Sequence, residues 1–149
     1  MNGTDPVAAL QAALAAEHAT VYGYGVAGAR LRGDAQATAH LLWQSHRAKR
    51  DRLADLIIAR RAEPVAAAPA YRLPIQVTSS RTAGLLAAAM EDRLAAAYLA
   101  LVGVDEAKLR TLGAQSMQEA VIRACRWRAG PTRSAFPGLG GTALAPLPE

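Results

Sequence analysis

Two glutamates and one histidine lie within the apolar faces of predicted helices in this 149-residue sequence. Glu17 interrupts a stripe in which apolar residues recur three and four positions apart, the spacing of a buried helical face. Glu91 and His46 interrupt two further stripes of the same kind. Carboxylates and imidazoles bind iron, manganese or zinc, and they also neutralise one another as buried ion pairs. The spacing therefore predicts either a metal site or a buried polar network.

Four helices must position these residues. Caps, glycine stops and apolar periodicity predict helices over residues 6–33, 34–62, 79–103 and 105–129. Thr4 or Asp5 is the expected N-cap of the first helix, and Asp34 is the expected N-cap of the second. Ser79 or Ser80 begins the third. The sequence therefore predicts an all-α fold.

Residues 63–78 connect the second and third helices and contain three prolines, at positions 64, 69 and 74. Proline disfavours helix at the residue before it, so we expect an extended segment. About 16 extended residues span roughly 50 Å, whereas a hairpin between antiparallel neighbours needs only a few residues. The connection is thus long enough to cross the whole bundle, and the second and third helices are predicted to be parallel.

The polar residues fall at similar heights along their helices. Glu17 lies 16 residues before Gly33, and His46 lies 13 residues after it. At about 1.5 Å per residue their heights differ by only about 5 Å. Glu91 lies near the middle of the third helix, and Glu119 lies near the middle of the fourth, beside its apolar stripe. We therefore expect one polar layer at mid-height.

Several segments carry a family resemblance, namely AAEHATVYGYG, HRAKRDRLADLI, PAYRLP, MEDRLAAAYLALV and the terminal WRAG and AFPGL. They resemble an uncharacterised ferritin-like family of actinobacterial proteins, over nearly the whole chain. The resemblance implies a ferritin-like four-helix bundle with a long crossover between helices 2 and 3, and it implies no established activity. Ferritin-like di-iron proteins carry Glu on two helices and Glu-x-x-His on the other two. Here Trp43 replaces the Glu that would precede His46, and Ile122 replaces the His that would follow Glu119.

Two interpretations of the layer remain open. In the first, the di-iron site is degenerate, and Glu17 and Glu91 accept hydrogen bonds from His46 and from Arg50, one helical turn beyond it. This favours a structural or interaction protein without a cofactor. In the second, Glu17, His46 and Glu91, with Glu119 as a weaker ligand, bind one or two ions of iron, manganese or zinc. This favours a redox or storage protein, and neither interpretation assigns a catalytic residue.

The net charge of +5 permits a third alternative, a basic protein associated with nucleic acid. Arginines and a lysine cluster within residues 47–52, 60–61 and 123–128, where they could contact phosphates. No aromatic interleaving or docking motif accompanies them, so solvated helix faces explain them more simply.

The bundle is predicted to occupy residues 1–130, followed by an extended or disordered tail over residues 131–149 that is rich in Gly and Pro. We expect Phe136 and Leu139 to dock this tail on its own bundle or on a second subunit of a homodimer. A single cysteine, Cys125, fits a reducing compartment. The sequence shows neither a secretory pattern nor a membrane-length apolar stretch, so we expect a cytoplasmic protein without membrane contact.

Overall fold

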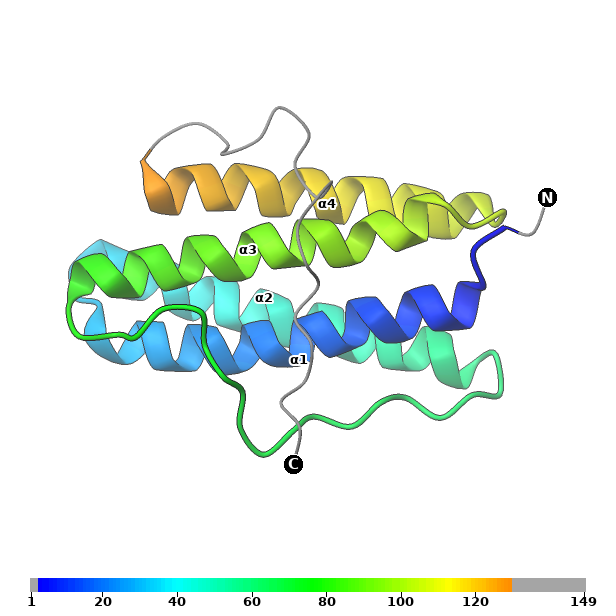
Figure 1. Ribbon diagram of the computed structural model, residues 1–149, viewed down its shortest axis with the longest axis horizontal. Helices are drawn as coiled ribbons and strands as arrows, with labels where there is room; N and C mark the ends of the chain where they lie inside the picture. Colours follow the sequence, from blue (N-terminus) through cyan, green and yellow to red (C-terminus); the bar gives the residue numbers. More distant parts are fainter. Residues whose placement is uncertain (1–2, 130–149) are drawn as a thin grey trace.

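The computed structural model describes residues 3–129, which form a four-helix bundle (Figure 1). The helices are α1 (Pro6–Arg30), α2 (Gly33–Ile58), α3 (Ser80–Val102) and α4 (Ala107–Arg128). No strand occurs in the described part of the chain. The predicted all-α bundle is confirmed, while the predicted tail over residues 131–149 lies outside the described residues. Within residues 3–129 no helix is both long and apolar enough to cross a bilayer.

Local sequence sets the starts of α1 and α3. Asp5 caps α1 by accepting hydrogen bonds from the backbone amides of Val7 and Ala8. Ser79 and Thr82 form a reciprocal capping box at the start of α3. The expected cap of α2 is wrong, because α2 begins at Gly33 without a side-chain cap and Asp34 lies within its first turn.

The end of α2 also differs from the prediction. The helix stops at Ile58 instead of Ala62, and Arg61 adopts a left-handed conformation with φ of 59°. A residue in this conformation cannot continue a right-handed helix, so α2 ends four residues earlier than predicted.

The segment between α2 and α3 crosses the full length of the bundle, so α2 and α3 run in the same direction (Figure 1). The predicted parallel arrangement is confirmed. Polar side chains of α1 fasten the crossover: Gln11 bonds to the backbone of Glu63 and Val65, and His18 Nε2 donates to the Val65 carbonyl over 2.9 Å. Alternate crossover residues pack on the core, namely Tyr71, Leu73, Ile75 and Val77.

The buried apolar side chains form two clusters. One includes Leu10, Leu53 and Leu101, and the other includes Leu31 and Met90. Glu17, Thr20, His46, Glu91 and Ser116 are also buried, although they are polar or charged. The core is therefore interrupted at mid-height by polar side chains.

The helices pack unequally. Extensive contacts join α3 to α4, α1 to α3 and α1 to α2, whereas α2 and α4 have no extensive contact. Helices α3 and α4 approach closely at Gly113, where an added Cβ would lie 2.7 Å from Leu101 Cβ and 3.0 Å from the Tyr98 carbonyl oxygen. Tight packing of α3 against α4 leaves an open seam between α4 and α2.

We predict that Gly113→Ala lowers the free energy of unfolding by about 1–3 kcal/mol, since α3 must move away from the new methyl group. Gly25→Ala is the matched control, because an added Cβ there meets nothing within 4 Å. It should raise the free energy of unfolding by about 0.5–1 kcal/mol through helix propensity. Urea denaturation of both variants measures the difference, and equal effects would contradict the assigned close approach.

Candidate functional site

His46 lies at the centre of the buried layer, between two carboxylates. Its Nδ1 lies 2.8 Å from Glu17 Oε2 and its Nε2 lies 3.0 Å from Glu91 Oε1. All three residues have no exposed surface. The structure thus brings together three of the residues that the sequence singles out, from α1, α2 and α3.

Two tyrosines complete the carboxylate contacts. Tyr98 donates its hydroxyl hydrogen to Glu17 Oε1 over 2.5 Å, and Tyr24 donates to Glu91 Oε1 over 2.6 Å. Trp127 Nε1 donates in turn to the Tyr24 hydroxyl over 2.8 Å. Tyr24 follows Glu17 on α1 by seven residues and reaches Glu91 on the antiparallel helix α3. In the same way, Tyr98 follows Glu91 on α3 by seven residues and reaches Glu17 on α1. Helical side chains lean toward the N-terminus, which brings both hydroxyls back to mid-height.

This repeated Glu-x6-Tyr spacing is a signal in the sequence that would have located both hydroxyls. The stripe positions alone predicted neither Tyr24 nor Tyr98 as a member of the layer.

Arg123 supplies the second cation. Its Nε donates to Glu91 Oε1 over 2.8 Å, and its side chain is only 13% exposed. Two carboxylates, one guanidinium and a protonated His46 sum to zero charge. A neutral imidazole has a single N–H, so one of its two contacts would set a lone pair against a carboxylate. With both carboxylates ionised, the geometry therefore requires an imidazolium at His46.

The pKa directions agree with this assignment. Burial by itself lowers the pKa of His46, but hydrogen bonds and charge from Glu17 and Glu91 raise it above its usual value overall. Burial by itself raises the pKa of Glu91, and His46 and Arg123 reverse the effect, so that pKa lies below its usual value. Burial and then the charge of the nearby carboxylates raise the pKa of Tyr24 and of Tyr98, which keeps both hydroxyls protonated as donors.

Arg50 does not join the layer, contrary to the sequence-based expectation. Its guanidinium pairs with Asp51 on the same helix, with the two closest contacts at 2.7 and 2.8 Å. Because α2 packs mainly on α1, much of α2 remains open to solvent, and Arg50 turns to that side. The buried cation comes from Arg123, the first residue of the basic cluster over residues 123–128 of α4.

Glu119 also lies outside the layer. Its side chain is 53% exposed and pairs with Lys49 over 2.5 Å and with Arg123 over 3.5 Å. The Lys49 contact bridges α2 and α4 near the surface, and the Arg123 contact lies within α4. The hydrogen bond from Lys49 is the main cause that lowers the pKa of Glu119.

Comparison with known proteins defines the family. Residues 9–141 match DUF4439, a domain of unknown function. The chain belongs to this family. A crystal structure of a conserved hypothetical protein from Mycobacterium tuberculosis is 35% identical, with a TM-score of 0.81. The similarity covers 87% of this chain and 98% of that chain. No curated protein matches the sequence.

In this DUF4439 domain, the candidate metal ligands of the layer form hydrogen bonds to one another and to neighbouring side chains. The groups that a metal would use are already engaged: both His46 nitrogens, both Glu17 oxygens and Glu91 Oε1 contact neighbouring side chains. Among the fully buried side-chain atoms of the layer in the described residues, only Glu91 Oε2 lacks a hydrogen-bond partner. No group of three or more His, Cys, Asp or Glu residues in this part of the chain is arranged to hold a metal.

Two residues stand where the di-iron pattern has a Glu and a His, namely Trp43 and Ile122. Neither is placed where it would help to complete a di-iron site. Ile122 is 51% exposed, so a histidine there would start from the outer face of α4. Trp43 is half-buried, stacks on His40 and lies beneath the Arg47 guanidinium, 4.6 Å from its ring centroid.

We predict that Arg123→Leu lowers the free energy of unfolding of this DUF4439 domain by about 3 kcal/mol, because it leaves the buried Glu91 charge without its guanidinium. Arg50→Leu removes an arginine of a solvent-facing ion pair and should lower the free energy of unfolding by less than about 1 kcal/mol. Urea denaturation of the two variants at pH 6 provides the comparison. A larger loss for Arg50→Leu would show that Arg50 is the buried cation.

We also predict that the free energy of unfolding depends on pH, and that His46 causes most of this dependence above pH 6.5. The raised pKa means that its contribution is complete below its usual value of 6.5 and is lost as pH rises through the folded-state pKa. The Glu91 contribution is complete above its usual value of 4.5 and is lost as pH falls. The free energy of unfolding should therefore decline above pH 6.5.

The His46→Gln variant should remove that alkaline decline. The His40→Gln variant should retain it, because His40 is exposed and contacts Gln44 instead of a carboxylate. Denaturation curves measured from pH 5 to pH 9 test both expectations. An unchanged alkaline slope in His46→Gln would contradict the imidazolium assignment.

Proposed function

We propose that this protein is a metal-independent, ferritin-like bundle that acts as a structural or interaction protein. The observation that carries the proposal is the position of His46, with one carboxylate at each ring nitrogen. The imidazolium and Arg123 supply positive charge that a bound metal would otherwise supply to buried carboxylates. Such a layer holds the helices together, and its hydrogen bonds engage all the carboxylate oxygens of Glu17 and Glu91 except Glu91 Oε2.

The helix order supports the ferritin-like part of the proposal. Ferritin-like folds join two antiparallel helix pairs by one long crossover and build their metal sites from side chains on facing helices. Here α1 with α2 and α3 with α4 form such pairs, and the crossover joins α2 to α3 (Figure 1). Glu17 and Glu91 project from α1 and α3 into the layer, while His46 and Arg123 project from α2 and α4.

Exposed apolar side chains support a second copy of the chain as the partner. Leu41 is 65% exposed and Ile58 is 58% exposed, both on α2, which packs mainly on α1. Ile122 is 51% exposed on α4. A homodimer that covers part of these faces would remove this surface from water.

We predict that protein purified without a metal-affinity tag contains iron, manganese and zinc at well below one ion per chain. A chelator should leave the melting temperature unchanged, since a ligand stabilises a protein only when it binds the folded state. Elemental analysis, thermal scans with and without chelator, and light scattering on the same sample test the proposal. Light scattering should give the mass of a dimer.

The alternatives give different results. A stoichiometric metal that is lost in Glu17→Gln, together with a chelator-dependent melting temperature, would establish the metal-binding alternative. Salt-dependent binding to a random DNA duplex would favour the nucleic-acid alternative. A monomer mass at micromolar concentration would exclude the homodimer.

A further inference from the structure

The outer side of α4 carries exposed apolar side chains. Met117, Val121, Ile122 and Cys125 lie within one half of the helix circumference, and we call them the α4 strip. Ile122 is 51% exposed, and the other three are half-buried. A shallow depression lies beside Met117, Val121 and Ile122, with Gln118 as its polar neighbour. The strip is therefore accessible to a further segment or partner.

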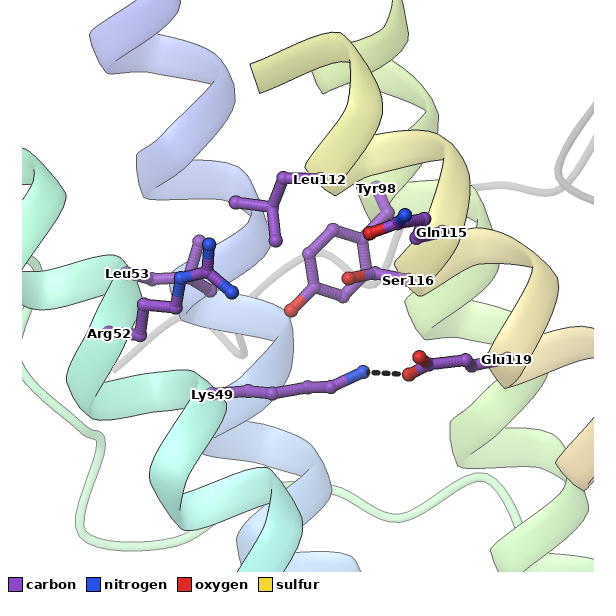
Figure 2. Close-up of a pocket in the computed structure, with 8 residues that line it drawn as sticks. All are labelled: Lys49, Arg52, Leu53, Tyr98, Leu112, Gln115, Ser116 and Glu119. Carbon is purple, nitrogen blue, oxygen red and sulfur yellow. Dashed lines mark hydrogen bonds and ion pairs between the residues drawn. The ribbon is translucent and has the colours of Figure 1, made fainter. Parts of the chain in front are cut away.

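The α4 strip points away from the seam between α2 and α4. On the seam side, Glu119 pairs with Lys49 over 2.5 Å (Figure 2). Val121 follows Glu119 by two residues, so at about 100° per residue the two side chains point about 160° apart around the helix axis. Within residues 3–129, α3 is the only helix with extensive contacts to α4. In the described bundle, no further helix is available to cover the strip.

The chain continues directly from this helix. Helix α4 ends at Arg128, and Ala129 adopts a left-handed conformation with φ of 50°, which stops the helix. Ile122 lies seven residues before Ala129, about 10 Å along the helix. Phe136 lies seven residues after Ala129 and can therefore reach up to about 24 Å from it. A segment that starts so close to the strip can close onto it with a small loss of chain entropy.

The segment that follows α4 belongs to the region matched by the family. The DUF4439 match continues past the end of α4 to residue 141, whereas residues 142–149 lie outside it. Within residues 130–141, Phe136 and Leu139 are the large apolar side chains, and Arg133 is the only charged one. The matched region thus includes two apolar side chains directly after a helix with an uncovered apolar strip.

We propose that residues 130–141 fold back on the α4 strip of the same chain, with Phe136 and Leu139 as the contacting side chains. Removal of apolar surface from water on both sides favours this contact. Covalent linkage gives the segment a high effective concentration at the strip, which a second copy of the chain would have to exceed. Leu41 and Ile58 of α2 stay available to a homodimer, so this inference and the proposed function depend on different residues and can fail independently.

Limited trypsin digestion of the full-length protein, followed by mass spectrometry, tests the proposal at the bond between Arg133 and Ser134. A protease cuts a docked segment only when the segment opens, so the cleavage rate reports the undocked fraction. We expect this bond to be cut about tenfold more slowly, or slower still, than in a synthetic peptide of residues 129–141. Equal rates in the protein and the peptide would overturn the proposal.

Variants on both sides of the contact should release the segment. Ile122→Asp places a charge in the α4 strip and should raise the cleavage rate at Arg133 by about fivefold or more. Leu139→Ala should also raise it, and the double variant should show less than the product of the two single effects, because both remove the same contact. Leu41→Asp is the matched control, since Leu41 is 65% exposed on α2, and it should leave the rate unchanged. Equal acceleration by Leu41→Asp would contradict the assigned strip.

Co-expression of Ile122→Asp chains with Leu139→Ala chains separates docking within one chain from docking on a second copy. If the segment docks within its own chain, both chains remain fast to cut in the mixture. If it docks on a partner, the intact segment of the Ile122→Asp chain meets the intact strip of the Leu139→Ala chain. Slow cleavage restored to the Ile122→Asp chain would therefore overturn the proposal in favour of a second copy.

Discussion

The structure depends on charge compensation around one buried imidazolium. Two carboxylates without exposed surface would carry a large desolvation cost in a core of alanine and leucine. His46 meets both of them, and Arg123 adds the second positive charge. Breaking any of these contacts would leave a charge in a poorly polarisable environment, which is why the layer constrains the helices that supply its members.

The layer also sets how the helices lie relative to one another. Its members come from all four helices: Glu17 and Tyr24 from α1, His46 from α2, Glu91 and Tyr98 from α3, and Arg123 and Trp127 from α4. Apolar faces made largely of alanine and leucine tolerate sliding, because one methyl group packs much like another. Sliding one helix by a turn, about 5.4 Å, would separate several hydrogen-bonded pairs at once. The polar contacts therefore select one axial arrangement among apolar alternatives of similar packing.

The same contacts decide what the mid-height of this bundle can do chemically. A di-iron centre needs carboxylates whose oxygens are free to coordinate. In this DUF4439 domain, the oxygens of Glu17 accept from Tyr98 and His46, and Glu91 Oε1 accepts from Tyr24, His46 and Arg123. Hydrogen-bond donors thus contact carboxylate oxygens that a metal ion would otherwise bind.

Local sequence determined the helices, the crossover and the height of the polar residues. Asp5, Ser79 and the prolines of residues 63–78 act through backbone geometry within a few residues, so their effects are visible without tertiary contacts. The partners of the carboxylates were decided only by tertiary structure. Arg50 and Arg123 are both long cations near mid-height, and what separates them is the tight packing of α4 on α3 and the open side of α2. Periodicity gives the face of each helix, but the rotation of one helix against another depends on contacts such as Gly113 with Leu101, which arise between residues distant in sequence.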